Sequence, residues 1–237
     1  MAYTNSPLIS YSKISPNKNP RESKIDTITI HCVVGQLSVE TMGDMFAKSS
    51  HQASCNYCIG SDGRIGLIVE EKDRSWCSSS RQNDHRAITI ECASEKSHPY
   101  AVNDEVYDSL IDLLVDICKR NDIKELRWQG DKSLIGQTDK QNMTVHRWFA
   151  NKACPGDYLY NLHGQIAKEV NAKLNSSVNN AEQNKILLTS ANDIVWELNH
   201  SFFPITEMEK FVKELDEAKE KNSSLYWGYY KLVNRIK

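Results

Sequence analysis

Two histidines and one cysteine have the types and spacing of metal ligands. His31 ends an alternating β-branched segment, and His146 and Cys154 stand eight residues apart in a later segment. Zinc binds imidazole nitrogen and thiolate sulfur, and a catalytic zinc site uses three protein ligands and keeps one position for water. The spacing alone is a weak signal, because a histidine at a strand end is more often structural. These residue types therefore permit a catalytic metal site without requiring one.

The remaining cysteines leave a second chemistry open. The chain has seven cysteines, an odd number that is too scattered for a small disulfide scaffold. We expect reduced and mostly buried thiols, and a thiol nucleophile paired with a histidine base remains an alternative. Cys55 and Cys58 could suggest a metal knuckle. Because residues i and i+3 of a strand face opposite sides, we expect this pair not to share an ion.

Strand and helix patterns alternate along the part of the chain that carries these residues. Period-two alternation of β-branched residues indicates strands, a GSDG turn indicates a hairpin, and apolar residues three and four apart indicate helices. The predicted strands are 26–33, 56–59, 64–69 and 87–92, and the predicted helices are 40–48, 104–120 and 157–174. This order predicts an α/β fold with a central mixed β-sheet flanked by helices.

A change in composition divides the chain. Residues 175–184, NSSVNNAEQN, hold a single large apolar residue and are predicted to be a linker between a first domain, 1–174, and a second one, 185–237. The second domain shows a capping-box pattern at residues 206–209 and an aromatic-rich end. We expect it to be small and mostly helical.

Charge and hydropathy exclude several classes of protein. The 237 residues include 29 Lys and Arg against 31 Asp and Glu, which excludes a nucleic-acid binder driven by a basic excess. No stretch approaches the roughly 18 apolar residues of a membrane span. The first 24 residues contain no apolar run of the length that a secretory signal needs.

Five segments, taken in order, resemble the zinc-dependent type-2 N-acetylmuramoyl-L-alanine amidases, a family that includes peptidoglycan recognition proteins and phage amidases. The resemblance covers residues 24–172. It rests on TITIH at 27–31, NYCIGSDGR at 56–64, RSW at 74–76, TIE at 89–91 and the segment 146–156. Each motif alone is short, and their common order is what makes the resemblance specific.

The resemblance implies a role for each matched residue. His31, His146 and Cys154 would bind Zn²⁺, which would activate water and polarise a carbonyl. Glu91 would take a proton from the attacking water and pass it to the departing amine. Lys152 would stabilise the developing oxyanion. The bond cleaved would be the amide between N-acetylmuramic acid and L-alanine, with Trp76 and Asn56 in contact with the peptidoglycan.

One departure from the family pattern concerns the hairpin. Aligned through its GSDG turn, the position of a tyrosine that is catalytic in some relatives holds Cys55. Tyr57 comes two residues later, so on a strand it would share the face of Cys55. A thiol is a poor replacement for a phenol, and the acid–base role is therefore assigned to Glu91.

These observations predict a peptidoglycan hydrolase of the phage or prophage endolysin type, acting on a Gram-positive host. It would be made in the host cytoplasm without a signal peptide and reach the cell wall after release. Residues 185–237 would target the wall or form a homo-oligomer. The alternatives are a non-catalytic peptidoglycan-binding module, a cytoplasmic wall-recycling amidase and a cysteine peptidase.

Overall fold

Two strands of nearly the same sequence form the centre of the main sheet. The computed structural model describes residues 3–175. Within them, β3 (Thr27–Cys32, TITIHC) and β7 (Ala87–Cys92, AITIEC) run parallel and pair residue for residue, from Thr27 beside Ala87 to Cys32 beside Cys92. Residues paired in this way point to the same face of the sheet. The register therefore fixes which side chains of the two strands meet.

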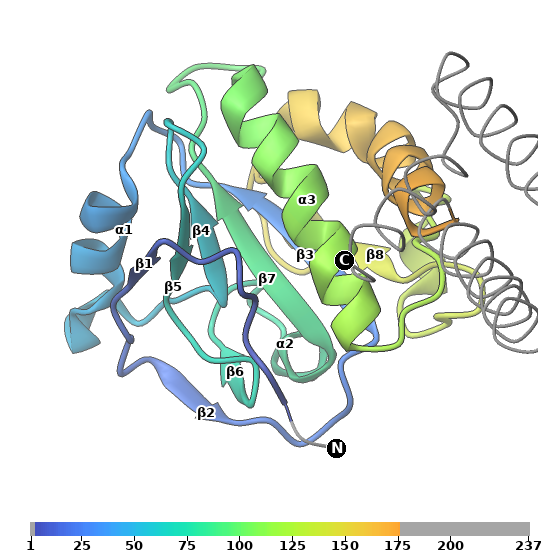
Figure 1. Cartoon of the computed structure of the whole chain (residues 1–237), viewed down its shortest axis with the longest axis horizontal. Helices are drawn as coiled ribbons and strands as arrows, with labels where there is room; N and C mark the ends of the chain where they lie inside the picture. Colours follow the sequence, from blue (N-terminus) through green and yellow to red (C-terminus); the bar gives the residue numbers. More distant parts are fainter. Residues whose placement is uncertain (1–2, 176–237) are drawn as a thin grey trace, which may run out of the picture. The chain divides into compact units, whose positions relative to one another are not determined.

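The main sheet has six strands in the order β1-β5-β4-β7-β3-β8 (Figure 1). The β4–β5 pair is antiparallel, and the other neighbours are parallel, so the sheet is mixed as predicted. A small second sheet pairs β2 with β6 in antiparallel fashion. The bounds are β1 Tyr11–Ser12, β2 Lys18–Pro20, β4 Tyr57–Ile59, β5 Ile65–Leu67, β6 Asp73–Ser75 and β8 Met143–Thr144.

Three of the helices in the described residues follow a polar residue whose side chain accepts a backbone N–H of the first turn. The caps are Ser38, Ser80 and Asn103, which precede α1 (Val39–Phe46), α2 (Arg81–Arg86) and α3 (Asp104–Arg120). Residues 156–175 are also helical. Short 3₁₀ turns are η1 (Ser49–His51), η2 (Lys132–Leu134) and η3 (His146–Trp148). None of the helices in the described part of the chain is long and apolar enough to cross a membrane.

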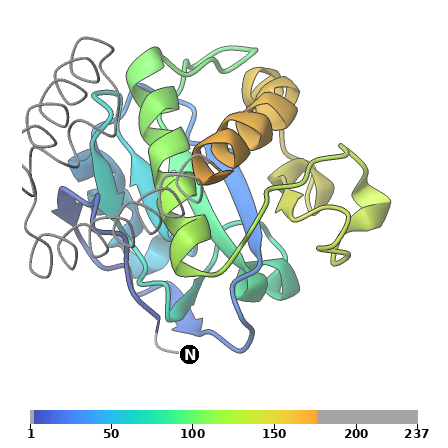
Figure 2. The same cartoon turned by 45° about the vertical axis from the view of Figure 1, so that its right-hand side comes forward.

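The two faces of the central strands differ in character. Ile28, Ile30, Ile88 and Ile90 are fully buried in one apolar cluster with α3 and the helix at 156–175, which lie over this face of the sheet (Figure 2). On the β4–β5 side, α1 packs in a second cluster. The alternating residues of β3 and β7 are Thr29, His31, Thr89 and Glu91, which give the opposite face its polar character.

The sequence predictions for the major elements are confirmed. The observed β7 and α3 have the predicted bounds, and the strand with His31, the hairpin and the helix at 156–175 differ from prediction by a few residues at their ends. The short strands β1, β2, β6 and β8 and the helix α2 were not predicted. Apart from Asn175, the predicted linker at 175–184 and helical domain at 185–237 lie outside the described residues.

The hairpin corrects two predictions about which residues share a face. Cys55 and Cys58 belong to the same buried cluster, whereas Tyr57 lies in the cluster under α3. The reason is that β4 begins only at Tyr57, so Cys55 lies before the regular strand, and the facing strand bulges there, with the amides of both Ile68 and Val69 donating to the carbonyl of Asn56. The simple alternation assumed from the sequence therefore fails before β4 begins.

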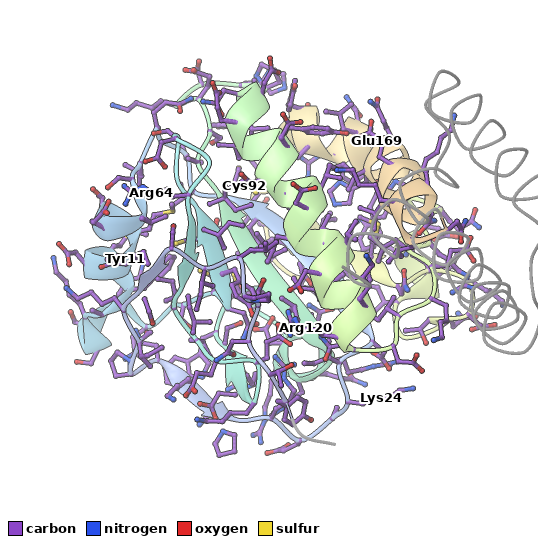
Figure 3. The ribbon with its side chains drawn as sticks, viewed as in Figure 1. Tyr11, Lys24, Arg64, Cys92, Arg120 and Glu169 are labelled. Atoms are coloured by element: carbon purple, nitrogen blue, oxygen red, sulfur yellow. The ribbon has the colours of Figure 1, made fainter. Side chains whose placement is uncertain are left out.

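A buried ion pair ties the end of α3 to the strand layer. The Glu71 side chain is fully buried, and its carboxylate accepts hydrogen bonds from Arg120 at 2.6 Å, from the Tyr57 hydroxyl at 2.7 Å and from Asn121 at 3.0 Å. Figure 3 places Arg120 at the C-terminal end of α3. The carboxylate therefore satisfies a guanidinium, a phenol and an amide at once.

We predict that Glu71→Ala lowers the free energy of unfolding by about 3 kcal/mol, because it leaves the partly buried Arg120 without its fully buried partner. Urea unfolding followed by circular dichroism measures the change. Asp112→Ala is the matched control, since it breaks an exposed pair with Lys173 and should have a much smaller effect. Equal effects of the two substitutions would contradict the importance of the buried pair.

Candidate metal centre

His31 and Glu91 face each other because β3 and β7 are in register. The two residues are direct pairing partners, and the His31 Nδ1 lies 4.0 Å from the Glu91 Oε1. The His31 side chain is fully buried, while that of Glu91 keeps 14% of its surface exposed. The Nε2 of His31 and the Oε2 of Glu91 have no hydrogen-bond partner within the described structure. A buried imidazole and carboxylate with free positions suit a bound ion.

The segment after β8 brings His146 and Cys154 to His31. The Cys154 Sγ lies 3.2 Å from the His31 Nδ1, and the His31 and His146 ring centroids are 5.1 Å apart. One donor atom from each of the three residues lies within 4.8 Å of the others. A tetrahedral zinc ion, with bonds of about 2.0 Å to nitrogen and 2.3 Å to sulfur, separates its donors by about 3.3–3.8 Å. The predicted trio is thus assembled at nearly the spacing that a zinc ion requires.

Arg147 holds this segment in its loop shape. Its backbone amide donates to the carbonyl of Cys154, and its guanidinium donates to the carbonyl of Ala153 at 2.6 Å and to Asp157 at 2.9 Å. Next to it, the Trp148 indole stacks on Trp128 with 5.1 Å between ring centroids. These contacts fix the loop from both ends, so the positions of His146 and Cys154 depend on the loop's own packing.

The electrostatics favour neutral imidazoles. Burial lowers the pKa of His31 well below its usual value, and burial, followed by the Lys152 ammonium, lowers the pKa of His146. Neutral imidazole is the form that binds a metal. Burial also raises the pKa of Glu91 to about 8. Cys154 shares a hydrogen bond with the Cys32 thiol, which raises the pKa of Cys154 first, with burial as the next cause.

Cys77 forms a second overlapping group with His31 and Glu91. The donor atoms of these three residues also lie within 4.8 Å of one another, and the Cys77 thiol donates to the Glu91 Oε1 over 3.7 Å. Cys77 could not be identified from the sequence, because a lone thiol after RSW has no recognisable spacing. The structure makes it a neighbour of the carboxylate.

The Asn56 side chain does not lie where a substrate could contact it. It is fully buried, its side-chain oxygen accepts from the Thr89 amide, and its NH₂ donates to the carbonyls of Val69 and Asp73. Its amide is thus committed to the backbone of three segments. The structure corrects the sequence interpretation, which read the residue from a short motif without its burial.

Lys152 and Trp76 lie at the surface. Lys152 is exposed two residues before Cys154. Trp76 is half-buried, and its indole N–H donates to Asn19 at 2.8 Å. Their roles toward a substrate stay predictions.

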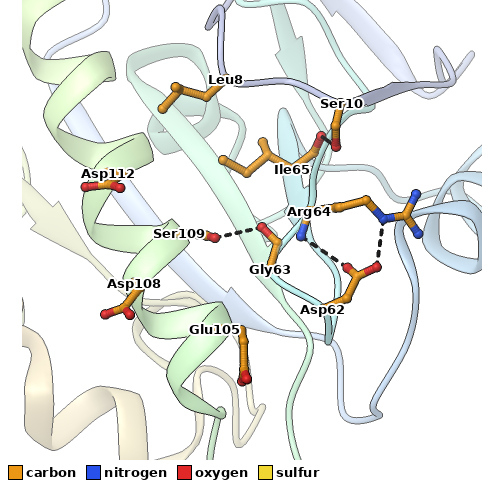
Figure 4. A pocket seen from close by; sticks show the side chains of 10 residues that line it. All are labelled: Leu8, Ser10, Asp62, Gly63, Arg64, Ile65, Glu105, Asp108, Ser109 and Asp112. Carbon is orange, nitrogen blue, oxygen red and sulfur yellow. Dashed lines mark hydrogen bonds and ion pairs between the residues drawn. The ribbon is translucent and has the colours of Figure 1, made fainter.

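A pocket of about 530 Å³ lies away from this group, between the turn of the β4–β5 hairpin and α3 (Figure 4). Its rim is acidic, with Asp62, Glu105, Asp108 and Asp112. None of the residues that line it belongs to the metal group. The candidate centre is therefore defined by its side chains and not by this cavity.

The fold and the site together define an α/β protein with a candidate mononuclear metal centre at the end of two parallel strands. The family model described as N-acetylmuramoyl-L-alanine amidase matches residues 21–157, more than half of the chain. The protein therefore belongs to the N-acetylmuramoyl-L-alanine amidase family. Membership supports a peptidoglycan amidase or binder.

Solved structures of low sequence identity are similar to this chain, and the first of them shares its fold. A mutant endolysin from Bacillus subtilis superposes with a TM-score of 0.51 at 14% identity, over 68% of this chain and 97% of that one. A selenomethionine derivative of AmpD gives 0.48 at 18% identity, over 67% and 94%. The Drosophila peptidoglycan recognition protein SA gives 0.48 at 15% identity, over 63% and 88%. No curated protein matches the sequence.

We predict that Asn56→Ala lowers the free energy of unfolding by at least about 2 kcal/mol, because it leaves one buried donor and two buried acceptors without a hydrogen-bond partner. Gln36→Ala is the control, since it removes an exposed amide that bonds Glu95. Urea unfolding compares the two. A fully stable Asn56→Ala with weakened peptidoglycan binding would return Asn56 to the substrate site.

Proposed function

We propose that this chain hydrolyses the amide bond between N-acetylmuramic acid and L-alanine in peptidoglycan, with a zinc ion held by His31, His146 and Cys154. The observation that carries the proposal is the convergence of these three donors beside Glu91, the in-register partner of His31. When bound, zinc would supply Lewis-acid activation of water and of the scissile carbonyl. A non-catalytic binder has no need for a carboxylate poised at such a group.

The residues of the chain would divide the work. Glu91, partly open to solvent, would accept the proton of the attacking water and deliver it to the leaving amine. Lys152, exposed beside the Cys154 loop, would place its ammonium near the developing oxyanion. Trp76 would offer its half-buried ring to the glycan or the stem peptide.

As a finer proposal, the enzyme attacks intact bacterial walls as an endolysin, after its release from the cytoplasm of the cell that made it. Residues 185–237, which lie beyond the family match and are predicted to form a second domain, support this over a wall-recycling enzyme. The two differ in substrate, because a recycling amidase acts on soluble fragments and an endolysin on the insoluble polymer.

The Cys154–His31 contact also favours a second candidate, a thiol peptidase. A sulfur 3.2 Å from an imidazole nitrogen is the spacing of a nucleophile and its base. This chemistry would survive metal chelation and be lost on alkylation. The proposed amidase would be lost on chelation.

We predict that the protein releases new N-terminal alanine from purified Gram-positive walls, that a chelator stops the release and that zinc restores it. Parallel digestion of soluble muropeptides tests the endolysin proposal, which expects the faster reaction on intact walls. New reducing sugar ends, or binding without any new ends, would overturn the amidase proposal.

Two substitutions should separate metal binding from proton transfer. Cys154→Ser should lower both the zinc content and the activity, because it removes the thiolate ligand. Glu91→Gln should keep the zinc and lower kcat by about 100- to 10,000-fold, the usual contribution of a general acid–base group. Metal analysis and rates on wall fragments give both quantities, and Cys118→Ala, a buried thiol of α3, is the control. A zinc-free Cys154→Ser with full activity would refute the mechanism.

A further inference from the structure

The Nε2 atom of His146 has a hydrogen-bond partner on another loop. The Ser79 hydroxyl lies 2.9 Å from the His146 Nε2, across 67 residues of sequence. Ser79 follows Cys77 and Ser78 in the segment between β6 and α2. A histidine that binds a metal through one ring nitrogen usually donates the N–H of the other to an oxygen, which fixes the tautomer and the ring orientation. Ser79 stands where such an oxygen would be.

The backbone around Ser79 is anchored on both sides. The buried Asp84 accepts the amides of Cys77 and Ser78 at 3.1 Å. On the other side, Ser80 caps α2 by accepting the amide of Asn83. Ser79 therefore has little freedom to move away from His146.

Asn83 connects the same loop to the central sheet. Its side chain donates to Ser78 and Thr29 and accepts from Thr144, at 3.0–3.2 Å. Thr29 and Thr144 belong to β3 and β8, which lead into the two histidines. The hydrogen bonds of Asn83 thus hold the loop in a fixed position relative to the strands that position the proposed ligands.

Ser79 also occupies an unfavourable backbone conformation. Its φ is +63°, in the left-handed region that glycine adopts without cost and a residue with a Cβ adopts at a penalty. Such residues concentrate at functional sites, where the surrounding structure enforces them. A glycine would suit this backbone better, and the serine adds a hydroxyl that meets His146.

We propose that Ser79 is a positioning residue for the metal centre. Its hydroxyl accepts the Nε2–H of His146, holds the imidazole in one tautomer and leaves Nδ1 free to bind zinc. This inference rests on the proposed function. Loss of an outer partner of this kind typically costs 10- to 100-fold in metal affinity.

The test is the zinc dissociation constant of the full chain, measured by competition with a chromophoric chelator, together with the melting temperature of the metal-free protein. Ser79→Gly should weaken zinc binding 10- to 100-fold and leave the melting temperature equal or higher, because it relieves the backbone. Ser79→Ala should weaken zinc binding similarly without that relief. A residue with a purely structural role would not separate the two quantities in this way.

Gln52→Gly is the matched control. Gln52 is exposed and has a φ of +52° at the end of η1, outside the metal group, so glycine there should relieve the backbone and leave zinc affinity unchanged. Unchanged affinity in both Ser79 variants would overturn the inference alone. Tighter binding would also overturn it, since the hydroxyl would then compete with zinc for Nε2. A wild-type chain that binds no zinc would overturn the proposed function, and the inference with it.

Discussion

The register between β3 and β7 is the constraint on which the rest of the site depends. It puts His31 directly beside Glu91 and, on the same strands, sends the isoleucines to the other face. A slip of one residue would turn one strand's polar side chains into the apolar layer under α3. The ligand and the carboxylate can therefore meet only in the register that also completes the core, so packing and chemistry select the same arrangement.

Below the site, hydroxyls and amides form a layer that an ordinary sheet would fill with apolar side chains. Thr29 bonds Thr144 at 2.8 Å, and Thr89 bonds Ser75 at 2.7 Å. Buried polar groups are costly unless each finds its partner, and a satisfied network has few alternative packings. The layer thus holds the loops above it in fixed positions relative to the strands. These loops carry Cys77, Ser79 and His146.

Local periodicity explains what could be predicted from the sequence. The strands with His31 and Glu91, the helix at 104–120 and the three candidate ligands follow from alternation, helical spacing and motif order. The bulge at Asn56, the burial of its amide and the contact between Ser79 and His146 could not be foreseen. They depend on hydrogen bonds between residues 13 to 67 positions apart, and a short polar segment such as CSSS carries no pattern that names its partner.

The donors of the candidate centre come from distant parts of the chain, since His31 and Cys154 are 123 residues apart. An unfolded chain cannot gather them, so an ion that binds here binds the native state alone. Mass action then links folding to free metal, and a concentration one hundred times the dissociation constant would add about 2.7 kcal/mol to stability. Resistance to unfolding and to proteolysis would accordingly rise and fall with the concentration of free metal. The stability of the protein would then depend on its surroundings as well as on its sequence.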